Sequence, residues 1–156
     1  MKNVSNKLIM SVSRLLFALY LILLAYFLFF SEHYGRTIIS GEYRYNLTPF
    51  KEVKRFIEYR NIIGPEGFIV NIFGNIFAFA PFGFVLPIIS PDNRKLLNIT
   101  LLSLEFSLTI ELLQLIFKVG IFDVDDLMMN TLGGFLGGVC FILARKLLRS
   151  IRRGKR

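Results

Sequence analysis

The sequence predicts an all-α integral membrane protein, a compact bundle of four transmembrane helices with a short external amphipathic helix, formed as a single domain over residues 1–156. The first observation is composition: 54% of the residues are hydrophobic, 17 are Phe and the mean hydropathy is +0.56, which is more apolar material than a soluble domain of this length can bury. The second is charge placement, because the Lys and Arg residues behind the net charge of +8 gather at the chain ends and between apolar runs. These features exclude a disordered chain, a disulfide scaffold and a large multidomain enzyme.

Four apolar stretches are long enough to cross a membrane, since about 20 residues rising 1.5 Å each span a hydrocarbon core of roughly 30 Å. They cover about residues 8–30, 67–89, 96–117 and 127–144. The first contains the uninterrupted run LLFALYLILLAYFLFF, and Arg14 can extend its charge to the interface. No small-residue cleavage pattern follows this run, so it is predicted to be a retained anchor rather than a secretory signal.

Basic residues near the span ends predict the orientation. Three lie at the amino end, Arg94 and Lys95 lie between the second and third spans, and seven lie in the tail 145–156. Both termini are therefore expected in the cytoplasm and the loop 31–61 outside, although that loop has six basic residues against four acidic ones. The tail is predicted to be a positive-inside anchor, with an anionic-lipid surface as the alternative. Nucleic-acid binding is not expected, because no groove-reading motif accompanies the charge.

The later spans contain polar residues, which are costly in lipid: a carboxylate at the centre of a span costs about 2.5–3.5 kcal/mol. Such residues are retained where they face protein or a watery cavity. Helical spacing places them in one stripe on each span. The stripes comprise Asn71, Gly74 and Ala78 with Asn75 alongside; Ser107, Glu111, Gln114 and Lys118; and Asp126, Asn130, Gly133 and Gly137. Glu105 lies on a different face of the third span, near the midplane, together with Thr109.

The depth of these groups, counted along each span, places them in the outer half of the membrane. We therefore expect a small hydrated pocket that opens to the outside. Glu111, Asp123 and Asp126 form its candidate acidic cluster, which could act as a general acid–base group or bind a hard divalent cation. Helix capping is an equally good explanation for Asp123. No cofactor is predicted, and zinc is not expected because His33 is the single histidine.

Two further segments are expected to shape this pocket. Pro81 and Pro87 remove backbone hydrogen bonds from the second span, so they either kink it or hold open a cavity or re-entrant turn. In the external loop, an amphipathic helix is expected from Phe50 to Tyr59, capped by Thr48, where it could cover the pocket or simply the bundle surface. The basic residues that could contact anionic lipid or precursor phosphates here are Arg44, Lys51, Lys54, Arg55 and Arg60.

Four sequence blocks, in order, resemble the VanZ family: NLTPF (46–50), NIFGNIFAFAPFGFVLP (71–87), IELLQ (110–114) and FDVDDLMMNTLGG (122–134). The resemblance implies a small bundle in the bacterial inner membrane, and the founding member is associated with resistance to the glycopeptide teicoplanin. The family's polar and structural signature maps to Asn71, Asn75, Pro81, Gly83, Glu111, Gln114, Asp123, Asp126, Asn130 and Gly133, with Pro49 in the first block. Family members often have Arg just before the last block, where this chain has Lys118, a point charge rather than a two-pronged donor.

Three functions remain open on this basis. The first is a VanZ-like protein whose outward pocket binds or modifies an envelope lipid or peptidoglycan precursor, with Asn71, Asn75, Gln114, Lys118 and Asn130 as binding residues; whether it is an enzyme stays open. The second is a proton- or ion-coupled transporter with Glu105 as carrier. The third is a structural partner of another membrane protein. Expected partners are membrane lipids, a lipid-linked precursor or glycopeptide, and a second copy of the chain docked through its glycine faces, Gly133 and Gly137 among them.

Overall fold

The computed structural model describes residues 2–30 and 43–154, except for the side chains of residues 2–7, 63, 65–68 and 71–72. The described chain is almost entirely helical. Its elements are α1 (Lys2–Phe30), β1 (Tyr45–Asn46), α2 (Lys51–Glu58), α3 (Arg60–Ile89), the short 3-10 turn η2 (Pro91–Asn93), α4 (Leu96–Phe117), β2 (Phe122–Asp123) and α5 (Val124–Gly154).

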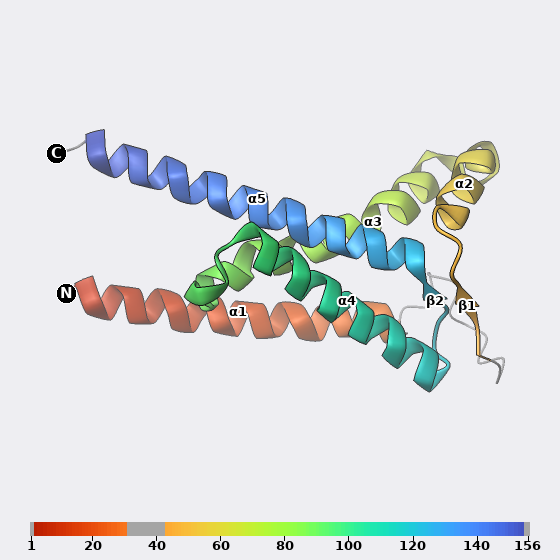
Figure 1. Cartoon of the computed structure of the whole chain (residues 1–156), viewed down its shortest axis with the longest axis horizontal. Coiled ribbons are helices and arrows are strands. Elements are labelled where there is room, and N and C mark those ends of the chain that lie inside the picture. Colours follow the sequence, from red (N-terminus) through yellow and green to blue (C-terminus); the bar gives the residue numbers. More distant parts are fainter. Residues whose placement is uncertain (1, 31–42, 155–156) are drawn as a thin grey trace.

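The long helices lie alongside one another, and both chain ends lie at the same end of the bundle, whereas α2, β1 and β2 lie at the opposite end (Figure 1). Three helices of the described chain are long and apolar enough to cross a membrane, Leu8–Phe30, Leu96–Phe117 and Val124–Gly154, and α3 contributes a shorter apolar stretch, Phe73–Ile89. The predicted all-α membrane fold is confirmed. The predicted span at 96–117 coincides with α4, and those at 8–30, 67–89 and 127–144 lie within the longer helices α1, α3 and α5.

Helix α3 contains one sharp break, and it is not at the prolines of the predicted span. Gly64 has φ 79° and ψ 166°, a non-helical conformation that glycine adopts without a side-chain clash. Beyond this point the helix continues through Pro81 and Pro87 to Ile89. The alternative of a re-entrant turn at these prolines is therefore wrong. Pro81 instead lines the cavity described below.

Glycines bring α3 and α5 into close contact. A Cβ atom added at Gly83 would overlap the carbonyl oxygen of Gly134, and one added at Gly137 would overlap that of Ala80. A Cβ atom at Gly133 would likewise collide with the backbone of Ile76. Small-residue faces permit this kind of approach in membrane helices, where dispersion contacts replace the hydrophobic effect. The glycine face of α5 that was expected to dock a second copy is therefore occupied by α3 of the same chain.

The apolar core lies between α1, α3 and α4, where Leu24, Phe79 and Ile110 are buried. The rings of Phe82 and Phe106 stack beside it at 4.8 Å. Apart from the packing of Leu24 in this core, α1 is mostly exposed, because only 6% of its most apolar stretch is buried inside the structure. An exposed helix of this hydropathy is stable where lipid covers it.

Candidate functional site

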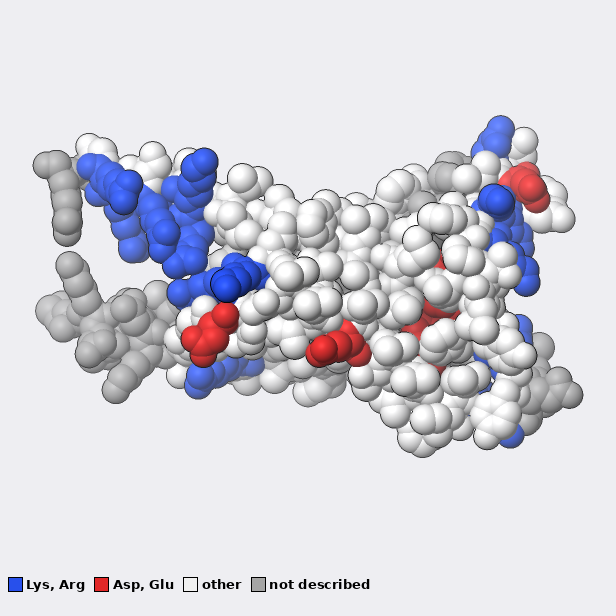
Figure 2. Space-filling model, viewed as in Figure 1, with Lys and Arg blue, Asp and Glu red and all other residues white. Residues whose placement is uncertain are grey.

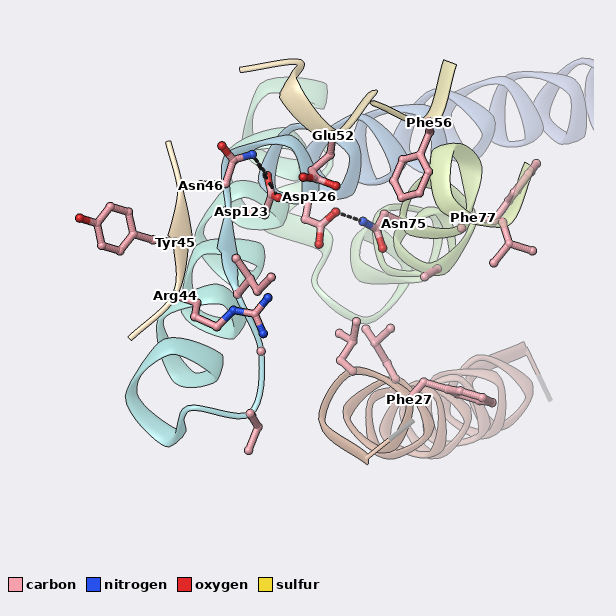
Figure 3. A pocket seen from close by; sticks show the side chains of 18 of the residues that line it. Phe27, Arg44, Tyr45, Asn46, Glu52, Phe56, Asn75, Phe77, Asp123 and Asp126 are labelled. Carbon is pink, nitrogen blue, oxygen red and sulfur yellow. Dashed lines mark hydrogen bonds between the residues drawn. The ribbon is translucent and has the colours of Figure 1, made fainter. Parts of the chain in front are cut away.

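A cavity of about 960 Å³ lies at the end of the bundle that carries α2 and the two short strands (Figure 3). Helices α1 and α3 form its apolar wall, and the segments 43–56 and 118–126 form its polar side. The apolar wall includes Tyr20, Leu23, Leu24, Phe27, Leu28, Val70, Phe77, Ala78 and Pro81. The polar side includes Arg44, Asn46, Lys51, Glu52, Arg55, Lys118, Asp123 and Asp126, with Asn75 from α3.

A two-residue parallel pairing holds the polar side together. Strand β1 pairs with β2 so that Tyr45 lies opposite Phe122 and Asn46 opposite Asp123. The Phe122 amide also donates to the carbonyl oxygen of Arg44 at 3.0 Å. This pairing brings the loop before α2 next to the start of α5, more than 70 residues further along the chain. The sequence analysis did not anticipate it, because two residues are too few to show a strand pattern.

Asn46 and Asp123 form the centre of a buried hydrogen-bond network. The Asn46 amide donates to both carboxylate oxygens of Asp123, at 3.1 and 3.2 Å, while its own side-chain oxygen accepts from the Thr48 amide at 3.2 Å. Asp123 also accepts from the amide of Asp125 at 2.8 Å, which caps α5 as the capping alternative predicted. The Asp123 amide in turn donates to the Glu111 carboxylate at 3.0 Å.

The Asp123 side chain is almost fully buried, and this burial has the largest effect on the pKa of its carboxyl group. Loss of water raises the pKa of this carboxyl above its usual 3.8, and the Asp125 amide, the Asn46 amide and the charge of Lys51 oppose the rise in part. The nearby charge of Asp125 adds to it. Asp123 is therefore a buried acid whose hydrogen bonds join β1, α4 and the start of α5, and it is not freely solvated.

The Asp125 carboxylate holds the start of α2, which lies more than 70 residues earlier in the chain. The carboxylate accepts from the amides of Phe50, Glu52 (2.8 Å) and Val53 (3.4 Å), which are the free N–H groups at the start of α2. The predicted helix is present, at Lys51–Glu58, but the predicted cap is wrong: the capping position is Phe50, with φ 62°, and it supplies no side-chain hydrogen bond. A carboxylate 75 residues away in sequence takes the place of Thr48.

Asp126, like Asp123, is an acid of the predicted cluster that lines the cavity, and its polar partner comes from α3. The Asn75 side chain donates to it at 2.5 Å, and both groups line the cavity (Figure 3). This contact joins α3 to the first turn of α5. Two of the polar stripes predicted from helical spacing therefore meet at this point.

Four basic side chains line the same cavity, and three of them have defined neighbours. Arg55 pairs with Glu52 at 2.6 Å, Lys118 lies 4.7 Å from the centre of the Tyr43 ring, and Lys51 is close enough to act on the charge of Asp123. Arg44 extends from β1 toward the cavity, and its guanidinium makes no hydrogen bond or ion pair with the described residues (Figure 3). Lys54 and Arg60, expected with them, are not among the residues that line the cavity.

Several predicted site residues lie behind the cavity rather than in its lining. Glu111 is 2% exposed, and its carboxylate accepts from the Asp123 amide at 3.0 Å. Gln114 is 1% exposed and donates to the Leu28 carbonyl at 2.9 Å, which ties α4 to α1. Asn130 donates to the Ser107 hydroxyl at 2.9 Å. These three groups connect α4 to its neighbouring elements and are not among the residues that line the cavity.

The remaining predicted residues have varied positions. Asn71 lies in α3 with its side chain outside the described part of the structure. Pro49 lies in the turn before α2. Glu105 is exposed on the outer surface of α4, and the Thr109 hydroxyl donates to its backbone carbonyl rather than to its carboxylate. Within residues 2–30 and 43–154, no group of three or more His, Cys, Asp or Glu side chains is arranged to hold a metal ion.

Sequence reasoning missed two residues of this site, Asn46 and the capping role of Asp125. A local signal existed for Asn46, because Asn two residues before a backbone amide in a Pro-containing turn is typical of an Asx turn. No local signal existed for Asp125, since its partners belong to a distant helix.

Comparison with known proteins gives two matches. The family model described as VanZ/LLP1 matches residues 17–145. Protein VanZ from Enterococcus faecium is 32% identical over 137 residues, which cover 86% of this chain and 76% of that protein. No solved structure matches.

Proposed function

The chain belongs to the VanZ/LLP1 family, and from this premise we propose that its cavity binds a phosphate-bearing lipid of the bacterial envelope, either a membrane lipid or a lipid-linked peptidoglycan precursor. One observation carries the proposal: a single cavity joins a polar side, where four basic and three acidic side chains of the described residues lie, to an apolar helical wall. Such a cavity is complementary to a molecule with an anionic head and a hydrocarbon tail.

The volume suits a head group with the first part of a tail. Small-molecule sites commonly enclose about 300–1,000 Å³, and this cavity, at about 960 Å³, lies at the upper end of that range. The wall from α1 offers Leu23 and Phe27, and the wall from α3 offers Val70 and Phe77. Because α1 is otherwise little buried, a tail between α1 and α3 can continue into the surrounding lipid.

Arg44 is the residue expected to contact the phosphate. A guanidinium presents a planar set of donors that matches two phosphate oxygens, and charge-assisted bonds of this kind are the strong ones. The Asp126 carboxylate, held by Asn75, can accept from hydroxyl or amide groups of the same head group. Lys51 and Lys118 add positive potential at the rim.

Binding is favoured over proton transfer by Glu111. The Glu111 carboxylate is 2% exposed and accepts a backbone amide, so it does not face the space that a ligand would occupy. Asp126 lines the cavity, and the Asp123 carboxylate, which also lines it, is already bonded to Asn46 and the Asp125 amide, so we assign any acid–base chemistry on a bound lipid to Asp126. We therefore assign Glu111 a positioning role, through the amide of Asp123.

The proposal extends to location. We place the chain in the bacterial inner membrane with both termini in the cytoplasm and the cavity facing out, as the basic tail and the turn at Arg94 predict. Retention of a precursor or lipid in this cavity would alter the access of glycopeptides to the membrane surface. In this way we connect the site to the teicoplanin resistance associated with the family.

The orientation is tested separately. A Lys54→Cys variant lacking Cys140 should react with a membrane-impermeant thiol reagent on intact cells; protection until the cells are lysed would reverse the orientation.

The decisive experiment measures lipid binding. The purified chain in nanodiscs is titrated with a polyprenyl phosphate, and the same polyprenyl alcohol without phosphate serves as the reference ligand. Arg44→Gln should weaken phosphate-lipid binding by about 10- to 100-fold, because one charge-assisted contact contributes roughly 1.5–3 kcal/mol. Lys54→Gln is the matched control, since Lys54 is exposed on α2 and does not line the cavity. Equal binding of both lipids, or an equal loss in both variants, would refute the proposal.

A further inference from the structure

A second basic cavity lies at the opposite end of the bundle from the proposed ligand site. It measures about 800 Å³, and Lys and Arg side chains gather visibly on this end of the molecule (Figure 2). The basic residues that line it come from two segments far apart in sequence: Arg94 and Lys95 before α4, and Arg145, Lys146, Arg149 and Arg153 on α5. Its lining, within the described chain, includes no Asp or Glu.

The convergence of these cations is not explained by folding alone. Like charges at close range disfavour the packed arrangement, and here six basic side chains of the described residues line one cavity. Arg94 is held in place because its Nε donates to the Pro87 carbonyl at 3.0 Å, which leaves its terminal nitrogens available. Helix α4 also begins here, and its capping residue Lys95 supplies no side-chain hydrogen bond to the free amides of the first turn.

The apolar residues of the lining place this cavity at the edge of the membrane. Leu96 is the first residue of α4, and Ile142 lies on α5 just before the basic tail. A ligand that satisfies the whole site therefore has a negative head and an apolar body. Basic pockets between helices at a membrane surface suit anionic lipid head groups.

We propose that this cavity binds the phosphate of an anionic phospholipid from the leaflet on the side of the chain termini. The guanidinium group of Arg94, just before α4, and that of Arg149 on α5 contact the phosphate, and the acyl chains lie along Leu96 and Ile142. The bound lipid thereby relieves the repulsion between the two basic segments and links the two helices at this end. The positive-inside rule alone would account for the number of cations at this end, but it does not require them to line one shared cavity.

The test compares lipids and variants in nanodiscs made of phosphatidylcholine. The full-length chain is titrated with phosphatidylglycerol, and lipid binding is followed by native mass spectrometry and by the rise in melting temperature. Arg149→Gln should weaken binding about fivefold and the double variant Arg94→Gln/Arg149→Gln about 30-fold, on the basis of the usual contribution of each cation near an anionic surface. Arg152→Gln is the matched control, because it removes the same charge from the same helix outside the cavity lining. Its effect should stay below twofold.

Three results would overturn the proposal. The first is equal weakening by Arg149→Gln and Arg152→Gln, which would indicate diffuse attraction to the tail. The second is equal binding of phosphatidylglycerol and phosphatidylcholine. The third is competition by millimolar inorganic phosphate, which would make the ligand a soluble anion rather than a lipid. If Arg149→Gln fails to fold, Arg149→Lys keeps the test open, because it must retain most of the phosphatidylglycerol binding.

Discussion

Replacement of Asp125 by Ala should release α2 from the bundle while the transmembrane helices stay folded. The Asp125 carboxylate is 3% exposed and accepts three backbone amides at the start of α2. Helix α2 has no buried residue of its own, so apolar packing offers little to replace these bonds. Its attachment therefore depends on this remote cap.

The structure allows an estimate of the effect. A hydrogen bond to a charged group contributes about 1.5–3 kcal/mol, and two of the three bonds, to Phe50 and Glu52, are well formed. Their loss should cost on the order of 3 kcal/mol of local stability, which corresponds to a roughly 100-fold larger population of the open helix and equally faster amide exchange. Asp125→Asn keeps one acceptor oxygen and should have an intermediate effect.

Hydrogen–deuterium exchange of residues 54–58 measures this opening directly, because their amides bond within α2 rather than to Asp125. The exchange of α4 serves as an internal reference, and Asp92→Ala, which removes an exposed acid at the other end of the bundle, is the control variant. Unchanged exchange of residues 54–58 in Asp125→Ala would show that the cap does not hold α2 in place.

Two further predictions concern stability. Gly83→Ala should lower the free energy of unfolding by about 3 kcal/mol or more, because the added methyl group overlaps a backbone carbonyl that cannot move aside. Gly154→Ala is the control for thermal unfolding in detergent and should be neutral, because its added methyl group meets nothing within 4 Å. Equal melting temperatures of the two variants would contradict the contact between α3 and α5. The second prediction concerns Asp123, where burial raises the pKa of the carboxyl above 3.8, so the folded chain keeps this proton to higher pH than the unfolded chain does. The stability of the fold therefore falls as the pH rises from the pKa of the unfolded chain through the higher pKa of the folded chain. The melting temperature of the native chain, relative to Asp123→Asn, should therefore decline between pH 3.8 and neutrality, and a constant difference would show that burial does not govern this carboxyl.

A cavity lies at the end of the bundle that carries α2, but its lining differs from the predicted set of residues. Asn75 and Asp126 meet across two helices, as their helical spacing indicated. Glu111 was expected as the central acid and instead lies behind Asp123, where it accepts a backbone amide. Helical periodicity correctly placed Glu111 on a buried face of α4. It could not show which neighbour that face would meet.

Local properties of the chain were sufficient for the helices, the family and the amphipathic segment. The length and hydropathy of residues 8–30 and 96–117 determine helices in lipid, because unsatisfied backbone groups are too costly there. The helical spacing of the apolar residues after Phe50, with charged residues between them, likewise determines α2. Each of these features depends on residues within a few turns of one another.

Tertiary structure alone decided the partners of the polar groups. The contacts of Asn46 with Asp123 and of Asp125 with α2 join positions more than 70 residues apart, and they depend on the depth and rotation of α5 relative to the rest of the chain. That placement is set by close backbone packing, where Gly83 and Gly137 allow α3 and α5 to approach. A shift of one helical turn would leave every periodic pattern in the sequence intact and yet give these side chains different partners, because periodicity defines the face of a helix but not its position along a neighbour.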